Sequence, residues 1–94
     1  MCADQEAKKA FKVHGRVQGV GFRWWAQHQA RSLGLRGTVR NCADGAVEIA
    51  FAGGGEAVEE MRRRLETGPP ASYVVSLEEL EPPERFPPDF QIGF

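Results

Sequence analysis

The sequence predicts an α+β fold in which two helices pack on one face of a mainly antiparallel sheet of four to five strands. Segments that alternate apolar and polar residues indicate strands, and segments that repeat apolar residues at helical spacing indicate helices. They follow one another as β-α-β-β-α-β, with a further short alternating run near the C-terminus. This order is typical of the split βαβ, or ferredoxin-like, arrangement. The first two strands are then parallel, and the third lies between them.

The composition predicts one soluble globular domain over residues 1–94, of which residues 1–7 form a loose N-terminal tail. Apolar residues make up 41% of the chain and charged residues 27%, which suits a modest core. The net charge of −1 argues against a general nucleic-acid binder. No apolar run approaches the roughly 20 residues of a membrane span, and no signal peptide is evident. We therefore expect a cytoplasmic protein with no nucleic-acid and no membrane partner.

The first strand is expected at about 8–14. Its alternation directs Phe11 and Val13 toward the core, and Lys12 and His14 toward the opposite face. We therefore interpret His14 as a surface histidine of a strand and not as a catalytic one.

The segment 22–33 predicts the first helix, which Gly34 ends. Its apolar stripe consists of Phe22, Ala26, Ala30 and Leu33. Trp25 widens this stripe and Trp24 lies off it. We expect both tryptophans to pack against the sheet or the preceding loop, and we assign no role to His28.

The segments 36–42 and 46–52 predict a β-hairpin, because the Asp44-Gly45 pair between them is a strong turn signal. In the second of these strands, Val47, Ile49 and Phe51 alternate with the other residues of the segment. The glycines at 53–55 are expected to end it.

The second helix is predicted at 56–67, with Val58, Met61 and Leu65 facing inward. Its arginines at 62–64 are interpreted as a solvated face that pairs with glutamates at helical spacing. A fourth strand follows at about 73–80. The proline-rich segment 81–89 is expected to be an extended loop, and the alternation of Phe90, Ile92 and Phe94 suggests a short terminal strand.

The loop between the first strand and the first helix is the strongest candidate for a binding site. It carries glycines at positions 15, 19 and 21, which permit positive φ angles and a close approach to a ligand. Successive N–H groups and the N-terminal end of the following helix can bind an anion together. Arg23, in the first helical turn, can contact two oxygens at once. The same spacing also fits a structural turn that binds nothing.

The predicted topology brings Asn41 to the same end of the sheet as this loop. Both follow the C-terminal ends of strands that are parallel to each other, about two strand spacings or roughly 10 Å apart. Alternation puts Asn41 on the same face as Val39, the face that the helices cover. Its amide either binds a ligand in this gap or only ties down the adjacent turn.

These two segments resemble the signatures of the acylphosphatase family. The run Val13–Arg23 is similar to the first signature, G-x-V-Q-G-V-x-F-R. The run Gly37–Val47, with Gly53 six residues further on, is similar to the second. The resemblance extends over about residues 8–94.

The resemblance implies hydrolysis of small-molecule acyl phosphates to a carboxylate and inorganic phosphate, without a metal or a cofactor. It implies that Arg23 and Asn41 are catalytic: Arg23 binds the phosphate and Asn41 holds the attacking water. The loop residues implied to bind the phosphate are Gly15, Arg16, Val17, Gln18, Gly19, Val20 and Gly21. Where the family usually has an aromatic residue this sequence has Thr38, which faces away from Asn41 and so concerns packing more than chemistry.

The side chains of both signatures contain no obvious general base. An asparagine amide does not titrate near neutral pH but can accept a hydrogen bond from water, and Asp44 is explained by the turn. The proton of the water therefore passes most simply to a phosphate oxygen of the substrate. Positioning and charge stabilisation are then the main work of the protein.

The main alternative is a non-catalytic binding module, and a second alternative is closer in class to the enzyme. An RNA-binding module would carry aromatic residues on the open sheet face, but Glu48 and Ala50 stand there. A metallochaperone would need paired cysteines, but Cys2 and Cys42 are far apart in the sequence. The second alternative is an accessory domain that acts on carbamoyl phosphate within a larger maturation protein. The short chain favours a stand-alone enzyme, which we expect to be a monomer.

Overall fold

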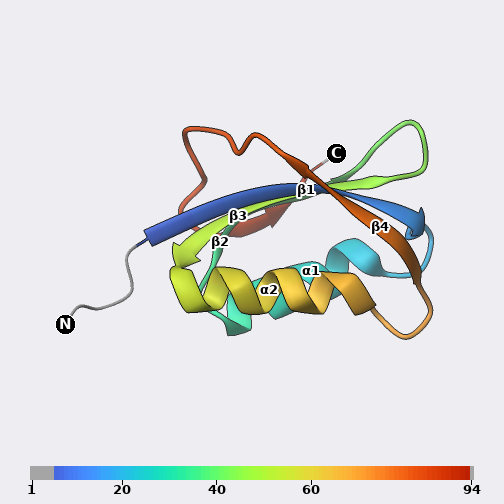
Figure 1. Cartoon of the computed structure of the whole chain (residues 1–94), viewed down its shortest axis with the longest axis horizontal. Helices are drawn as coiled ribbons and strands as arrows, with labels where there is room; N and C mark the ends of the chain where they lie inside the picture. The colour runs from blue at the N-terminus through green and yellow to red at the C-terminus, as the bar shows by residue number, and fades with distance from the viewer. Residues whose placement is uncertain (1–5, 94) are drawn as a thin grey trace.

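The computed structural model describes residues 6–93 and contains one five-stranded sheet and two helices (Figure 1). The order of elements is the predicted β-α-β-β-α-β, followed by a short fifth strand. Their bounds are β1 (Glu6–Arg16), α1 (Phe22–Ser32), β2 (Arg36–Asn41), β3 (Val47–Gly54), α2 (Gly55–Thr67), β4 (Tyr73–Leu80) and β5 (Phe90–Ile92). Neither helix in this part of the chain is long and apolar enough to cross a membrane.

The strands lie in the order β4-β1-β3-β2-β5, so β3 is inserted between β1 and β2 as predicted. Both neighbours pair with β3 in antiparallel fashion, which makes β1 and β2 parallel to each other. At one end of the sheet, Val47 of β3 pairs with Val13 on one side and with Asn41 on the other. The ends of β1 and β2 that lead to the glycine loop and to the hairpin therefore lie at the same edge.

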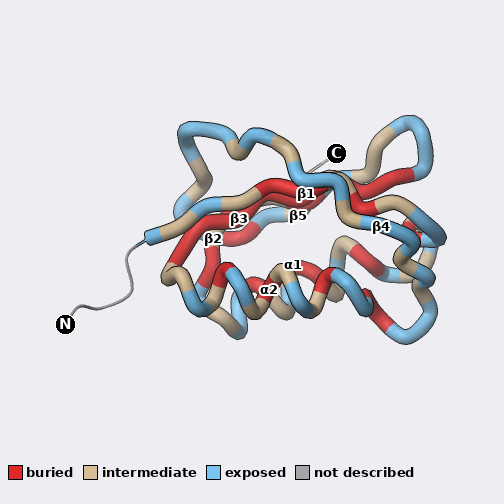
Figure 2. Tube along the Cα trace, in the orientation of Figure 1, coloured by how far each residue is buried: buried red, intermediate tan, exposed pale blue. Residues whose placement is uncertain are grey.

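Both helices cover one face of the sheet, and the core lies between the two layers (Figures 1 and 2). This confirms the predicted apolar stripe of α2 and the first three residues of that of α1, which are buried. Leu33, the fourth, is only partly buried and follows the end of α1 at Ser32. The buried core residues from the strands are Phe11, Val13, Val39, Val47, Ile49, Phe51 and Phe90, and those from the helices are Phe22, Ala26, Ala30, Val58, Met61 and Leu65.

The opposite face of the sheet is not fully open. The proline-rich segment 81–89 arches over it (Figure 1), and Glu81 and Pro83 line one hollow together with Ala10, Thr38 and Ala50. Thr38 therefore lies on the face away from the helices, as predicted. The segment forms no helix or strand, which agrees with its interpretation as an extended loop.

Two strands extend beyond their predicted bounds. We expected a loose tail up to residue 7, but β1 begins at Glu6, which pairs with Gly54 and forms an ion pair with Arg36. The rest of the predicted tail lies outside the described residues. We also expected the glycines at 53–55 to end β3, but the strand continues through Gly54. A Cβ atom at Gly53 would lie 2.5 Å from the end of the Leu35 side chain, which would have to shift to admit a larger residue.

The terminal strand β5 pairs in parallel with β2 and closes that edge of the sheet. Phe90 pairs with Gly37, and Ile92 pairs with Val39. The N–H of Gly93 also donates to the carbonyl oxygen of Val39, over 2.8 Å. Ile92 therefore lies on the strand next to that of Asn41, at the end of the sheet where the glycine loop lies.

Candidate active site

A hollow of about 210 Å³ lies where the glycine loop, the start of α1 and the end of β2 meet. Its lining residues come from separate parts of the sequence and include both residues that we singled out as catalytic. They are Val17, Gly19, Gly21, Phe22, Arg23, Trp24, Asn41 and Ile92. The parallel arrangement of β1 and β2 is what brings these segments together.

The glycine loop reaches this hollow through backbone conformations that favour glycine. Gly19 and Gly21 have φ angles of 75° and 77°, and Gly21 is the N-cap residue of α1. A Cβ atom at either position would meet no atom within 4 Å, so the requirement for glycine is conformational and not steric. The first N–H groups of a helix have no partner within the helix, and here they lie beside the hollow. No acidic residue stands in the first turn of α1 to compete for them.

Arg23 and Asn41 contribute the polar side chains of the hollow. Arg23 is the second residue of α1 and Asn41 is the last residue of β2, on the helix-covered face as predicted. Both are partly exposed. Neither side chain forms a hydrogen bond or ion pair with another residue between 6 and 93. One guanidinium group and one amide group therefore border the same small space.

Gln18 does not line the hollow, although we expected it to bind substrate. Its side-chain amide nitrogen donates hydrogen bonds to the carbonyl oxygens of Cys42 and Ala46, each over 2.8 Å. Both carbonyls belong to the hairpin that follows Asn41. Gln18 thus connects the glycine loop to the β2–β3 hairpin.

Three other loop residues also lie away from the hollow. Gly15 and Arg16 extend β1 and pair with Val74 and Tyr73 of β4, after an irregularity in register at His14/Gly15. A Cβ atom on Gly15 would collide with the carbonyl oxygen of Tyr73. Val20 packs against the core. Of the predicted loop set, the structure therefore brings Val17, Gly19 and Gly21 to the hollow.

Trp24 and Ile92 line the hollow but were not among the predicted site residues. Trp24 lies off the apolar stripe of α1 and is 62% exposed, so the expectation that it packs against the sheet or the preceding loop is wrong. Its position directly after Arg23 was the only signal in the sequence that could have identified it. Ile92 reaches the hollow through the pairing of β5 with β2, which the alternation of the terminal segment does not reveal.

The titratable groups near the hairpin are engaged with one another on the other face of the sheet. Asp44 accepts a hydrogen bond from the N–H of Ala46 and forms an ion pair with Lys12 over 2.7 Å. The Lys12 ammonium, together with this N–H group, lowers the pKa of the Asp44 carboxyl. This agrees with the interpretation of Asp44 as a turn residue. His14 pairs with Glu78 at the surface over 2.9 Å, as expected of a strand histidine.

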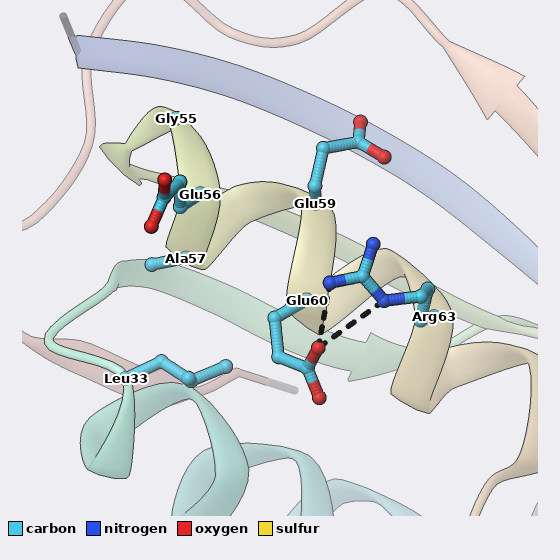
Figure 3. Close-up of a pocket in the computed structure, with 7 residues that line it drawn as sticks. All are labelled: Leu33, Gly55, Glu56, Ala57, Glu59, Glu60 and Arg63. Carbon is cyan, nitrogen blue, oxygen red and sulfur yellow. Dashed lines mark hydrogen bonds and ion pairs between the residues drawn. The ribbon is translucent and has the colours of Figure 1, made fainter. Parts of the chain in front are cut away.

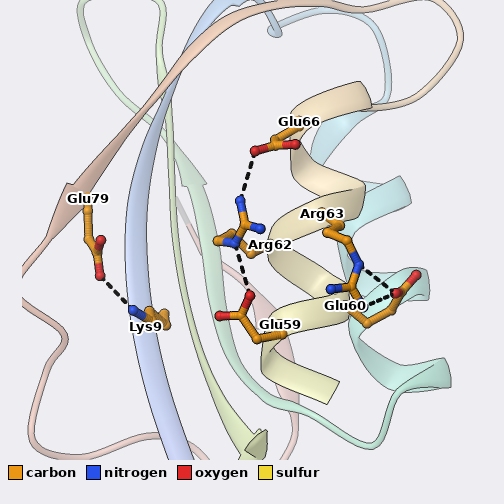
Figure 4. A network of polar contacts seen from close by, with 7 residues as sticks. All are labelled: Lys9, Glu59, Glu60, Arg62, Arg63, Glu66 and Glu79. Atoms are coloured by element: carbon orange, nitrogen blue, oxygen red, sulfur yellow. Dashed lines mark hydrogen bonds and ion pairs between the residues drawn. The ribbon is translucent and has the colours of Figure 1, made fainter. Parts of the chain in front are cut away.

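A larger hollow of about 720 Å³ lies at the start of α2 but is less suited to an anion (Figure 3). Three glutamates line it, and its one arginine, Arg63, donates to Glu60 over 2.7 Å. Arg62 is likewise paired with Glu59 and Glu66 on the same helix (Figure 4). The predicted pairing of these arginines with glutamates is confirmed, but Arg64 is partly buried and also donates to Gln29 of α1 over 2.7 Å.

No cluster of three or more histidine, cysteine, aspartate or glutamate side chains between residues 6 and 93 is arranged to hold a metal ion. The thiol of Cys42 is free, in agreement with prediction, and Cys2 lies outside the described residues. The charge available at the 210 Å³ hollow is thus the guanidinium of Arg23 together with the start of α1.

Comparison with known proteins agrees with this fold and with the family that the two segments resemble. The acylphosphatase family model matches residues 9–92. An acylphosphatase of Rhizobium etli is 42% identical over 91 residues, which cover 96% of this chain and 97% of that protein. The structure of an acylphosphatase from Coxiella burnetii has a TM-score of 0.84 and 30% identity, covering 99% of this chain and 100% of its own. HypF of T. kodakarensis has a TM-score of 0.80 and 32% identity, covering 96% of this chain and 12% of its own. The chain belongs to the acylphosphatase family.

Proposed function

We propose that this acylphosphatase hydrolyses acyl phosphates in the hollow between the glycine loop and Asn41. The phosphate binds to the loop, the start of α1 and Arg23, and Asn41 orients the attacking water. The observation that carries the proposal is that the arginine and asparagine of the two signatures line one small space. The products are a carboxylate and inorganic phosphate.

Phosphate binding is supported by the chemistry of the loop side of the hollow. A helix N-terminus offers N–H donors and the positive end of the helix dipole, and both favour an anion. The positive φ angles of Gly19 and Gly21 turn the backbone around that end. The guanidinium of Arg23 can contact two phosphate oxygens in a planar, bidentate arrangement. These groups also stabilise the negative charge that the phosphoryl group carries during transfer.

Water positioning is supported by the location of Asn41, which lines the same hollow as the start of α1 but comes from β2. Its side-chain oxygen can accept a hydrogen bond from a water molecule, and its NH₂ group can donate one to a phosphate oxygen. A water held in this way is directed at phosphorus. Because binding already fixes the orientation of the water and the phosphate, less entropy is lost in the reaction step.

The reaction balances without a titrating side chain. The water oxygen forms a bond to phosphorus, and the bond between phosphorus and the acyl oxygen breaks. The electron pair of that bond leaves with the carboxylate, and the proton of the water passes to a phosphate oxygen. Asn41 does not gain or lose a proton, in keeping with the chemistry of an amide.

We further propose that the protein works as a single-domain monomer in the cytoplasm. Coverage of 97% of the Rhizobium etli acylphosphatase supports a single domain more than the match to a small part of HypF does. The charged pairs on the outer face of α2 support a monomer, because they leave that face without an apolar patch (Figure 4). The free thiol of Cys42 suits a reducing compartment. Light scattering during size-exclusion chromatography tests the monomer.

An isotope experiment tests the proposed reaction. Benzoyl phosphate is hydrolysed in ¹⁸O-labelled water containing EDTA, and the products are analysed by mass spectrometry against a blank without enzyme. We expect turnover above the blank, with the enzyme-dependent label in inorganic phosphate. Label in benzoate would show attack on the acyl carbon and contradict the role of Asn41. Absence of turnover would contradict the enzymatic proposal.

A further inference from the structure

Apart from Arg23 and Asn41, the side chains that line the hollow are apolar, and one of them is an exposed tryptophan. Trp24 is one of three large apolar side chains that are strongly exposed among the described residues, and the other two, Tyr73 and Val75, lie on β4. Of these three, only Trp24 lines the hollow. The other apolar side chains that line it are those of Val17, Phe22 and Ile92. An indole ring held in water next to a binding site is a contact surface for a ligand more often than a packing residue of the core.

The indole of Trp24 is also held in place. Its ring lies against that of His28, one helical turn further along α1, with 3.8 Å between ring centroids and an interplanar angle of 35°. The Nδ1 atom of His28 lies 3.1 Å from the carbonyl oxygen of Trp24, which fixes the imidazole to the same turn. A side chain that is braced in this way loses little further freedom when a ligand contacts it.

We infer that Trp24 and Ile92 form the binding surface for the acyl group, and that the enzyme favours acyl phosphates with an aromatic or extended apolar acyl group. The inference rests on the proposed function, because the phosphate must occupy the loop and Arg23 for the acyl group to reach this surface. Trp24 follows Arg23 directly at the start of α1, so both side chains border one hollow. Besides Arg23, no charged residue lines it. An acyl group with its own charge therefore finds no partner for that charge.

Two substrates and matched variants test this inference. The ratio of kcat/KM for benzoyl phosphate to that for acetyl phosphate is measured for wild type, Trp24→Ala, Trp24→Phe and Tyr73→Ala. Benzoyl and acetyl phosphate share the reacting phosphate and differ in the apolar area of the acyl group. Tyr73→Ala removes an exposed aromatic residue from β4, away from the hollow, and serves as the control. Circular dichroism checks that each variant folds.

We expect Trp24→Ala to lower kcat/KM for benzoyl phosphate by about tenfold, mainly through KM, because the phenyl ring loses an aromatic contact. The loss for acetyl phosphate should be less than about threefold, since a methyl group offers little area. Trp24→Phe should keep most of the wild-type preference for benzoyl phosphate over acetyl phosphate, and Tyr73→Ala should keep the wild-type ratio of kcat/KM. Competitive inhibition should follow the same pattern: in Trp24→Ala, inhibition by phenylphosphonate should weaken more than inhibition by methylphosphonate.

Two outcomes would overturn the inference. An equal fold loss in kcat/KM for both substrates would show that Trp24 acts on the phosphate site or on stability, and a wild-type kcat/KM for both would remove it from acyl recognition. Failure of the proposed function is distinguishable from either, because wild type would then hydrolyse neither substrate.

Discussion

The side-chain amide nitrogen of Gln18 lies 2.8 Å from the carbonyl oxygen of Cys42, the residue next to Asn41. The same nitrogen donates to Ala46 on the other arm of the hairpin, over 2.8 Å. The loop that we propose to bind phosphate and the strand end that we propose to position water are therefore joined by one side chain. We therefore propose a positioning role for Gln18, which its place in the signature did not reveal.

Replacing Gln18 should separate positioning from stability. In Gln18→Glu, a carboxylate faces two carbonyl oxygens and repels them, whereas Gln18→Leu only removes the donor. Each carbonyl keeps a second donor: the N–H of Gly45 donates to the carbonyl oxygen of Cys42, and the N–H of Cys42 donates to that of Ala46. We therefore expect a stability loss of about 1 kcal/mol for Gln18→Leu, measured by urea unfolding.

The effect of these substitutions on turnover should exceed their effect on phosphate affinity. We expect kcat to fall by about tenfold in Gln18→Leu, and by more in Gln18→Glu, because a small misplacement of Asn41 is costly. Inhibition by inorganic phosphate should change less than kcat. Wild-type kcat in both variants would refute the positioning role.

Arg23→Lys should lose about 100-fold in kcat/KM. A lysine keeps the positive charge but cannot reproduce the planar, bidentate contact with two phosphate oxygens. Arg40→Lys is the matched control, because Arg40 pairs with Glu48 away from the hollow. Steady-state kinetics on benzoyl phosphate measure both variants. Near-normal turnover in Arg23→Lys would exclude the bidentate contact.

Gly15→Ala should destabilise the fold. The φ angle of Gly15 is 132°, and an added Cβ atom would collide with the Tyr73 carbonyl oxygen. We expect a loss on the order of 3 kcal/mol in the free energy of unfolding. Gly34→Ala is the control, because its φ of 74° is also positive but no atom lies within 4 Å of the new Cβ. Its loss should be only about 1 kcal/mol. Equal losses would show that the contact with β4 does not matter.

The ion pair between Lys12 and Asp44 predicts a pH dependence with a defined sign. The Lys12 ammonium and the Ala46 N–H lower the pKa of Asp44 below its ordinary value of 3.8. Because the folded-state pKa lies below that of the unfolded chain, the pair stabilises the fold above pH 3.8. That contribution is lost as the pH falls through the folded-state pKa.

Substitution of Lys12 tests this directly. In Lys12→Gln, the pKa of Asp44 should rise toward 3.8 without reaching it, because the Ala46 N–H still donates to the carboxylate. Lys9→Gln should leave the pKa of Asp44 unchanged, since Lys9 pairs with Glu79. NMR titration of the Asp44 carboxyl carbon measures both. A pKa of Asp44 that is the same in Lys12→Gln and wild type would contradict the account.

The fold could be predicted from the sequence because its signals are local. Alternation and helical spacing directed Phe11, Val13 and the stripe of α1 to the core, and the Asp44-Gly45 turn defined the hairpin. Strand β4 has the predicted bounds, Tyr73–Leu80. The convergence of the glycine loop and Asn41 followed from topology alone, and the family resemblance is confirmed.

What the sequence could not show depends on contacts between distant segments. The pairing of β5 with β2, which brings Ile92 to the hollow, joins residues about half the chain apart. Gln18 was expected to bind substrate because the resemblance implies that the whole loop does, and nothing local shows that its amide donates to the hairpin. The strand was expected to end before Gly54 because a run of glycines usually breaks a strand, and the pairing of Gly54 with Glu6 is not visible in the neighbouring sequence.

The central claim is that Arg23 binds phosphate while Asn41 orients water, and one variant tests it most directly. In Asn41→Ala, turnover of benzoyl phosphate and binding of inorganic phosphate are measured on the same preparation, by absorbance and by isothermal titration. We predict that turnover falls by at least about 100-fold while the Kd for phosphate stays within about threefold of wild type. Thr38→Ala, a substitution on the opposite face of β2, should change neither value. Loss of phosphate binding in parallel with turnover would contradict the account and make Asn41 part of the anion site.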